Sequence, residues 1–472
     1  MKTQIKHQSY DVAVIGAGVA GITVAQLCAR QGLKTILMDP TRDHEGNPLA
    51  GGASLLNGCI PAKILLQLSH EYHQLQQGRP GLKTKALELD LATAHAHIDN
   101  TIRRISNQIT ASLSNSGVEF LCASGRLLEG KQIEITALNH EPALITAEHI
   151  VLASGSHSMT LPSLPLDGNR VVDPIDAMRF TEVPKTLTVI GAGAIGLEIA
   201  GIWSRFGSQV TVLDAQNSLL PFADQEIANE MLASYRRRGI DIRLQAWVKQ
   251  AKIDGHGVTL TCQYPDQPPS DLYGDKVVVA IGRIPNTETL FAPEVDVVLD
   301  ENGYVHVDEQ CMTNLPEIFA VGDLVLGPMM AHKGIAEARV VADTIAGKAA
   351  QMEYTILPSV IYTLPEVAWI GRTEEALVAA GVPHRKSITP FTDNPKALVH
   401  GMAEGFIKIL AHAETDRILG IHIIGPQACE LIAEAVLAME YSASSEDLAD
   451  TIHAFPSLSD VLRQAALMLQ ES

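Results

Sequence analysis

The sequence predicts an α/β protein that has two parallel-sheet domains and a third domain of mixed α and β structure. Two stretches, residues 10–39 and 186–214, support the first part of this prediction. Each contains a Val- and Ile-rich strand, a glycine-rich turn, a helix, a second strand and an acidic residue, in that order. From about residue 354 the pattern changes to short alternating strands followed by helices, which predicts the third domain.

The first of these stretches is typical of a dinucleotide-binding unit. A strand over 10–15 leads into G-A-G-V-A-G at 16–21, a helix over 22–31 and a strand over 35–38. Glycines let backbone N–H groups and the helix N-terminus approach a pyrophosphate, and the acid after the second strand can accept hydrogen bonds from a ribose. The predicted binding residues are Gly16, Gly18, Gly21 and Asp39.

The second stretch repeats this unit, so the chain is expected to bind two dinucleotides. A strand over 186–190 precedes the glycine turn, the helix runs to Phe206, and a strand over 209–213 ends at an acid. That acid suits the free 2′-hydroxyl of NAD, and residues 215–217 contain no arginine to offset a 2′-phosphate, so NADH is predicted over NADPH. The predicted binding residues are Gly191, Gly193, Gly196 and Asp214.

Composition narrows the class of protein further. The chain has 472 residues, of which 46% are hydrophobic, and a formal net charge of −19, which argues against a broad nucleic-acid-binding surface. No segment is typical of a secretory signal or of a membrane span. The six cysteines show no paired or metal-like spacing, so we expect a cytoplasmic protein that binds no metal.

Residues 51–63, G-G-A-S-L-L-N-G-C-I-P-A-K, resemble the redox segment of the flavin-dependent pyridine nucleotide–disulfide oxidoreductases. This family includes dihydrolipoamide dehydrogenase and glutathione reductase, and its segment carries two cysteines that form a redox disulfide. Here Ser54 stands at the first cysteine position and Cys59 at the second. Pro61 is predicted at the first position of a helix, so Cys59 would precede the positive end of a helix dipole, which favours a thiolate.

Five further stretches resemble motifs of the same family, in the family's order. Residues 150–155 resemble the strand-to-turn crossover, 282–286 the A-x-G-R-x-P-N turn, and 318–323 the second flavin motif. Residues 329–337 resemble the flavin-edge helix of lipoamide dehydrogenases, and 358–368 the start of the dimerisation domain. The further cofactor-binding residues implied by the resemblance are Gly52, Lys63, Gly155, Gly282, Gly322, Asp323 and Ala331.

The resemblance implies a glutathione reductase-like fold with FAD and NAD as cofactors, and a homodimer. Two Rossmann-like domains would be followed by an α+β dimerisation domain. The expected boundaries are residues 1–155 and 276–350 for the two parts of the FAD-binding domain, 156–275 for the NAD-binding domain and 351–472 for the dimerisation domain.

The resemblance also implies a catalytic set in which the NADH side is intact and the thiol side is altered. Lys63 and Glu198 match the family's pair beside the flavin and the nicotinamide, and Cys59 matches its flavin-side thiol. On the substrate side, Phe455 stands where lipoamide dehydrogenases have the acid–base histidine, and Asp460 stands where they have the glutamate that orients it. A serine cannot form a disulfide and a phenylalanine cannot transfer a proton, so the two-cysteine relay and its base would be absent.

We therefore expect an FAD-dependent oxidoreductase that passes electrons from NADH to a small-molecule acceptor. Cys59 would either form a mixed disulfide, persulfide or sulfenic acid, or leave the reduced flavin to react directly with a quinone, another nicotinamide or a carbon substrate. Two alternatives are a dihydrolipoamide dehydrogenase and, in another class, a non-catalytic flavin-binding protein that responds to NADH.

Overall fold

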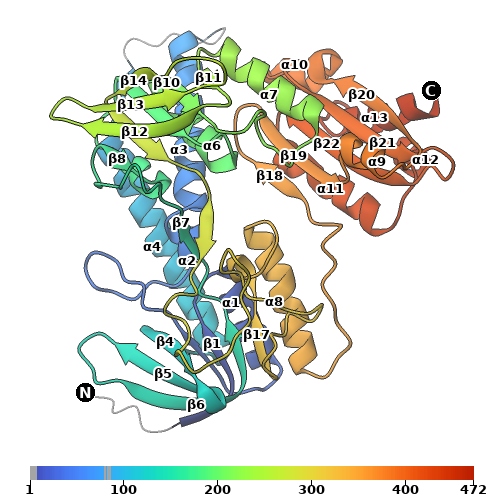
Figure 1. Ribbon diagram of the computed structural model, residues 1–472. Coiled ribbons are helices and arrows are strands. Elements are labelled where there is room, and N and C mark those ends of the chain that lie inside the picture. Colours follow the sequence, from blue (N-terminus) through green and yellow to red (C-terminus); the bar gives the residue numbers. More distant parts are fainter. Residues whose placement is uncertain (1–7, 79–80, 82–86, 472) are drawn as a thin grey trace. The chain divides into compact units, whose positions relative to one another are not determined.

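A computed structural model describes residues 8–78, 81 and 87–471 of the chain (Figure 1). Its contacts divide the chain into two compact units. The first comprises Met1–Ile64, Asp90–Met159 and Arg283–Met352, and the second comprises Leu65–Leu89, Thr160–Gly282 and Glu353–Ser472. The domain boundaries expected from the sequence stay a prediction.

The first unit is built on a sheet with strand order β3-β2-β1-β6-β5-β4, in which β17 also pairs with β6. The strands β3, β2, β1, β6 and β17 run parallel, whereas β4 and β5 are antiparallel. The strands are β1 (Gln8–Ile15), β2 (Thr35–Met38), β3 (Glu119–Leu121), β4 (Ala123–Leu128), β5 (Gln132–Ala137), β6 (Ala143–Leu152) and β17 (Ile318–Ala320). Every residue of β2 is buried, as is usual for a strand inside a parallel sheet.

Helices α1 (Val19–Arg30) and α8 (Ala331–Ile345) pack on each other in the first unit. Val24 and Cys28 of α1 and Val341 of α8 lie in the same hydrophobic core. Helix α1 begins three residues earlier than predicted, because the N–H of Ile22 already donates to the carbonyl of Gly18 at 2.9 Å. The unit also contains α2 (Gly52–Leu56), α4 (Leu91–Asn115), the 3₁₀ turns η1 (Glu129–Lys131) and η2 (Gly322–Leu324), and the antiparallel pair β7 (Ser156–Ser158) and β16 (Arg283–Pro285).

Helix α3 (Cys59–Gln77) corrects one local prediction. Cys59 is its first residue and Pro61 its third, rather than Pro61 its first. The proline still falls in the first turn, where its missing N–H removes no helical hydrogen bond. Residues up to Ile64 belong to the first unit and those from Leu65 to the second.

The second unit contains a parallel sheet with strand order β11-β10-β9-β15-β8. The chain between β11 and β15 forms an antiparallel sheet, β12-β13-β14, and residues 264–269 connect its last two strands. The strands are β8 (Val171–Val172), β9 (Thr186–Ile190), β10 (Gln209–Leu213), β11 (Asp241–Arg243), β12 (Trp247–Ile253), β13 (Val258–Gln263), β14 (Ser270–Gly274) and β15 (Lys276–Val279). The helices are α5 (Pro174–Ala177), α6 (Ala194–Phe206) and α7 (Gln225–Arg237).

The C-terminal part of the second unit is an antiparallel sheet with strand order β18-β19-β22-β21-β20. One face carries Ile407, Ile409, Ile421 and Ile423, which pack in one core with residues of the last helices. The strands are β18 (Ser359–Ile361), β19 (Glu366–Gly371), β20 (His384–Pro390), β21 (Phe406–His412) and β22 (Ile418–Gly425). The helical segments are α9 (Glu374–Ala379), η3 (Phe391–Asp393), α10 (Pro395–His400), α11 (Ala428–Glu440), α12 (Ser445–Asp450) and α13 (Asp460–Gln470).

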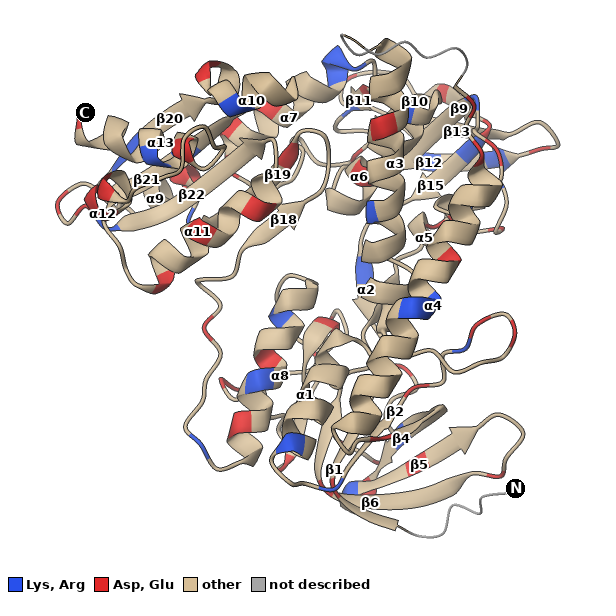
Figure 2. Cartoon of the chain, turned by 180° about the vertical axis from the view of Figure 1, so that it is seen from behind, with Lys and Arg blue, Asp and Glu red and all other residues tan. Residues whose placement is uncertain are grey.

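The charged residues are unevenly distributed over the helices. Both signs occur along α8, whereas α11 and α12 carry acidic residues without basic ones (Figure 2). In the described part of the chain, none of the helices combines the length and apolar character that crossing a bilayer requires.

Candidate active site

The first glycine turn, between β1 and α1, is shaped by close backbone contacts. Gly16 has a φ of +110°, and a Cβ there would lie 2.2 Å from the carbonyl oxygen of Ala153. A Cβ at Gly21 would lie 1.9 Å from the carbonyl oxygen of Gly16. Because only glycine fits both positions, the turn brings the N-terminus of α1 to the carboxyl edge of the sheet.

Asp39 closes this turn from the end of β2. Its Oδ2 accepts a hydrogen bond from the N–H of Ala17 at 2.8 Å, and its Oδ1 accepts one from Thr41 at 2.9 Å. The carboxylate therefore lies beside the glycine turn, as a ribose-binding acid in this kind of site must.

The redox segment lies directly against the same turn. The N–H of Gly51 donates to the carbonyl of Ala17 at 2.8 Å. Gly52 has a φ of +63°, and a Cβ there would lie 2.5 Å from the Cα of Gly18. The structure thus joins Gly18 and Gly52, two residues predicted separately to bind cofactor.

Ser54, on α2, lies against Gly58, the residue before the first residue of α3. A Cβ at Gly58, the residue before Cys59, would lie 3.7 Å from the Cα of Ser54. Cys59 is exposed in the chain and Ser54 is half-buried. No disulfide joins the six cysteines, all of which lie in the described part of the chain. Burial raises the pKa of the Cys28 thiol to about 12, as expected for a packing residue.

The second flavin-like motif, after β17, holds an acid that the sequence also identified. Ser156 donates to Oδ2 of Asp323 at 2.5 Å, and Arg283 donates to the hydroxyl of Ser156 at 2.8 Å. Sequence reasoning missed both Ser156 and Arg283 as neighbours of Asp323, although Arg283 lies in the G-R-x-P-N turn. The chain separations of 167 and 127 residues explain why no local pattern revealed them.

A buried ion pair in α8 supports the same motif. Lys333 and Glu337 are both fully buried, with Nζ and Oε1 2.9 Å apart. Lys333 also donates to the carbonyl of Gly322 at 2.9 Å, and the N–H of Gly322 donates to Glu337 at 2.7 Å. The pair, which lies just after Ala331 in α8, therefore fixes the turn that contains Gly322 and Asp323. The i,i+4 spacing of Lys and Glu was the available signal.

Gly155, at the end of the crossover from β6, has a φ of +73° and no neighbour that a Cβ would meet within 4 Å. Its carbonyl accepts from the N–H of Asn286, and Asn286 also donates through its side chain to the carbonyl of Ser154 at 2.8 Å. The crossover and the turn at 282–286 are thereby joined.

The second glycine turn, in the second unit, repeats the geometry of the first. A Cβ at Gly191 would lie 2.2 Å from the carbonyl oxygen of Ala280, and one at Gly196 would lie 2.0 Å from that of Gly191. Asp214 accepts from the N–H of Ala192 at 2.6 Å. A Cβ at Gly193 would meet no protein atom within 4 Å, so a pyrophosphate at the N-terminus of α6 is what would require glycine there. Gly282 likewise has open space and a φ of +137°.

Glu198 lies in the first part of α6 and is buried, with 8% of its surface exposed. Its Oε1 accepts a hydrogen bond from the N–H of Tyr362 at 2.9 Å. Lys63 belongs to the first unit and Glu198 to the second, so their pairing stays a prediction.

The three C-terminal positions of interest have different surroundings. Phe455 is 76% exposed in the chain. Asp460 is buried, and its carboxylate accepts from Arg463 at 2.9 Å and from Gln464 at 2.7 Å, so it is engaged within α13. His453, two residues before Phe455, contacts Glu434 at 2.6 Å and the carbonyl of Thr451 at 2.8 Å.

Within the described ranges, no group of His, Cys, Asp and Glu side chains is arranged to hold a metal ion. The glycine turns and their acids fit two dinucleotides. A chain with two such sites, one of them in contact with an exposed thiol segment, has the equipment of a dinucleotide-dependent oxidoreductase.

The chain belongs to the pyridine nucleotide-disulphide oxidoreductase family, which it matches over residues 10–338. Residues 357–466 match the family's dimerisation domain, which supports the expected homodimer. The family binds FAD and uses NAD(H), so the chain is an FAD-dependent oxidoreductase of the dihydrolipoyl dehydrogenase-like type.

Curated relatives cover nearly the whole chain. It is 38% identical over 468 residues to a dihydrolipoyl dehydrogenase of Cupriavidus necator, with 98% of both chains covered. It is 39% identical to dihydrolipoyl dehydrogenase 3 of Pseudomonas aeruginosa, again with 98% of both covered. A leghemoglobin reductase of Vigna unguiculata is 36% identical, with 97% of this chain and 87% of the relative covered.

Among solved structures, LpdA from Mycobacterium tuberculosis superposes with a TM-score of 0.89 at 26% identity. The match covers 98% of this chain and 99% of LpdA. The predicted glutathione reductase-like fold class is therefore confirmed.

Proposed function

We propose that the protein oxidises NADH through FAD and delivers the electrons to a small acceptor without an internal redox disulfide. The observation that carries the proposal is Ser54, which lies against Gly58 and stands at the position where the family's redox segment has its other cysteine. A hydroxyl group cannot replace a thiol in a disulfide. Cys59 would then act as a single thiol next to the flavin, and a cytoplasmic location remains part of the proposal.

FAD, when bound, supplies the hydride- and electron-accepting chemistry, and the protein supplies position and charge. Glu198 would orient the nicotinamide. Lys63 would stabilise the negative charge that develops on the reduced ring. The carboxylate of Asp214 would select NADH, because it accepts a ribose hydroxyl and repels a 2′-phosphate.

A dihydrolipoyl dehydrogenase activity is the second candidate, and the curated relatives favour it. Against it stand two residues: Ser54 cannot take part in thiol–disulfide exchange, and Phe455 cannot act as the base. A non-catalytic flavoprotein that responds to NADH is the third candidate. It predicts reduction by NADH without turnover on quinones, nicotinamide analogues, lipoamide or other small acceptors.

Anaerobic titration of the flavin spectrum with NADH tests the proposal. We expect the first equivalent of NADH to bleach the flavin, because no disulfide stores two electrons ahead of it. Two variants serve as comparisons. Ser54→Cys restores a second thiol, so a disulfide can take up two electrons ahead of the flavin. Cys59→Ser should titrate like the parent protein. A stable two-electron state with a long-wavelength thiolate–flavin band in the parent protein would contradict a mechanism without an internal redox disulfide. Steady-state turnover with a panel of acceptors then separates the three candidates.

A further inference from the structure

The carboxylate of Glu198 is held by a residue that directly follows a strand of the C-terminal sheet. Glu198 lies on α6, beside the nucleotide-binding turn, and Tyr362 follows β18, yet the N–H of Tyr362 donates to Oε1 of Glu198 at 2.9 Å. A buried carboxylate takes its orientation from its hydrogen-bond donors. The position of Glu198 therefore depends on how firmly the C-terminal sheet is fixed to the nucleotide-binding part of the second unit.

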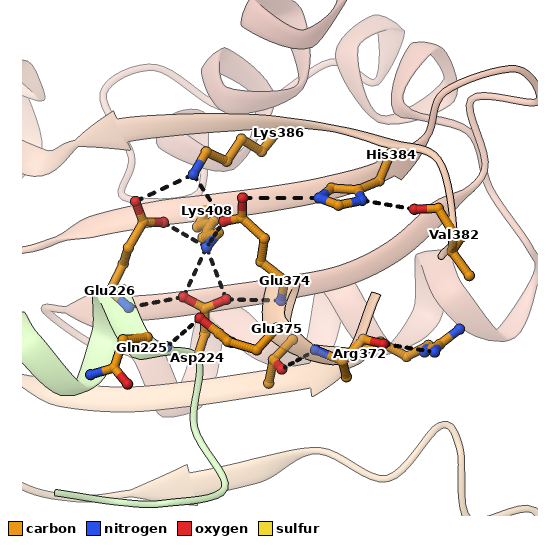
Figure 3. Close-up of polar contacts among 12 residues, drawn as sticks. Asp224, Gln225, Glu226, Arg372, Glu374, Glu375, Val382, His384, Lys386 and Lys408 are labelled. Atoms are coloured by element: carbon orange, nitrogen blue, oxygen red, sulfur yellow. Dashed lines mark hydrogen bonds and ion pairs between the residues drawn. The ribbon is translucent and has the colours of Figure 1, made fainter. Parts of the chain in front are cut away.

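An ion cluster at the N-terminus of α7 joins the C-terminal sheet to the nucleotide-binding part of the second unit (Figure 3). Lys408 of β21 is fully buried, and its Nζ lies 2.9 Å from both carboxylate oxygens of Asp224, the residue that caps α7. The same ammonium lies 2.5 Å from Glu226 and 2.6 Å from Glu374, at the start of α9. Lys408 thus joins α7 of the nucleotide-binding part to two elements of the C-terminal part.

The centre of the cluster is strong because Lys408 and Asp224 lie away from water. Burial lowers the pKa of Lys408, but hydrogen bonds to Asp224, Glu226 and Glu374 outweigh it and raise the pKa overall. Lys386 adds a second cation, 2.9 Å from Glu374. Removing Lys408 would leave the carboxylate of Asp224 buried without its counter-ion, which is costly.

The other end of α7 is tied to the same strand. Arg237 and Arg238, at the end of this helix, bind the two carboxylate oxygens of Glu404, two residues before β21 begins. Helix α7 is therefore held at both ends by residues on or next to β21.

Strand pairing connects Lys408 to the strand that leads to Tyr362. In the register of the sheet, Lys408 pairs with His422, His422 with Trp369, and Trp369 with Ser359 of β18. Paired residues share one face of a sheet, and this face is opposite to the one that packs on α11 and α13. Ser359 is three residues before Tyr362, so a rigid sheet transmits the position of Lys408 to the N–H that holds Glu198.

We propose that Lys408 is a positioning residue for the reduction of the flavin by NADH. Its contacts with Asp224, Glu226 and Glu374 fix the C-terminal sheet on α7 and keep the N–H of Tyr362 on the carboxylate of Glu198. This inference rests on the proposed role of Glu198 beside the nicotinamide.

The test compares Lys408→Met with Arg385→Met in the FAD-loaded protein. Arg385, on β20, pairs with Asp416 at 2.6 Å and donates to the carbonyl of Leu469, so its loss weakens the C-terminal part without touching α7. Anaerobic stopped-flow absorbance gives the limiting rate of flavin reduction at saturating NADH. The rate at which photochemically reduced flavin is reoxidised by a quinone serves as an internal control.

Lys408→Met should lower the limiting rate at least about tenfold, as expected for a misplaced orienting group. Arg385→Met, and the quinone reoxidation rate of both variants, should stay within about twofold of the parent protein. If Lys408 acts through Glu198, the double variant Lys408→Met/Glu198→Gln should be no slower than Glu198→Gln alone. An unchanged limiting rate, or independent effects in the double variant, would overturn the proposal.

A substitute variant and a hydrogen-exchange measurement complete the test. Asp224→Asn, which keeps the shape of the helix cap, replaces Lys408→Met if that variant yields no folded protein, and an unchanged rate in it would equally overturn the proposal. Hydrogen exchange of the Tyr362 amide should accelerate in the cluster variant and not in Arg385→Met. If NADH fails to reduce the parent protein, the proposed function fails, whereas unaltered exchange at Tyr362 overturns the positioning inference by itself.

Discussion

The carboxylate of Asp214 accepts a hydrogen bond from the backbone N–H of Ala192 at 2.6 Å. In the first unit, Asp39 has the same relationship with Ala17, at 2.8 Å. In both units the acid at the end of the second strand also closes the glycine turn. The acid that we expect to bind the ribose therefore also shapes the turn.

The cofactor preference should change with the charge at this position. Asp214→Asn combined with Gln216→Arg removes the repulsion of a 2′-phosphate and adds a cation. We expect the preference for NADH over NADPH, measured as the ratio of kcat/KM values, to fall by at least about tenfold, or about 1.4 kcal/mol. Asp214→Asn alone separates the lost charge from the added one. An unchanged ratio in the double variant would show that Asp214 does not select the cofactor.

Restoring the missing thiol and base should move the chemistry toward disulfide exchange. Ser54→Cys with Phe455→His is expected to raise the rate of lipoamide reduction by about tenfold or more, since general acid–base help alone is worth that much. Ser54→Ala with Phe455→His is the matched control, because it changes the same positions without adding a thiol. Equal rates in the two double variants would mean that further residues of the substrate site differ.

The contact between Gly52 and Gly18 should be needed for FAD binding. Gly52→Ala introduces a Cβ 2.5 Å from the Cα of Gly18, so the redox segment must shift away from the glycine turn. We expect FAD affinity, measured by fluorescence titration of the apoprotein, to fall at least about tenfold. Gly46→Ala is the control, because Gly46 also has a positive φ, of +86°, but a Cβ there meets nothing within 4 Å. Equal losses in both variants would assign the effect to backbone strain rather than to the contact.

Glu404 should make stability depend on pH in the acid range. Burial opposes its ionisation, but hydrogen bonds from Arg238 and Arg237 outweigh it and lower its pKa from 4.5 to about 2. Because the folded pKa lies below the unfolded one, the stabilisation is complete above about pH 4.5 and is lost as the pH falls toward 2. Glu404→Gln should lower the free energy of unfolding by about 1–3 kcal/mol at pH 7. Urea titrations should show this difference narrowing below pH 4.5, and a difference that stays constant from pH 7 to pH 3 would contradict the assignment.

The local parts of the fold could be predicted closely from residue patterns. Strands β9 and β10 have the bounds that their apolar runs predicted, and helix α6 ends at Phe206 as expected. Helix α4 begins at Leu91, where the carboxylate of Asp90 caps it by accepting from the N–H of Thr93, a local start signal of the same kind.

By itself, the sequence determined both glycine turns, the acids that close them and the family of the chain, because these features depend on residue type at short, fixed spacing. It also determined that Ser54 stands at the first cysteine position of the redox segment, which is a matter of residue identity alone. Only the tertiary structure decided which contacts hold Glu198 and Lys408 in position. The pairs Glu198–Tyr362 and Lys408–Asp224 join residues 164 and 184 positions apart. From the sequence alone, a lysine within a strand is expected at the surface, yet Lys408 is buried beside Asp224. Burial depends on which elements pack together and not on local spacing.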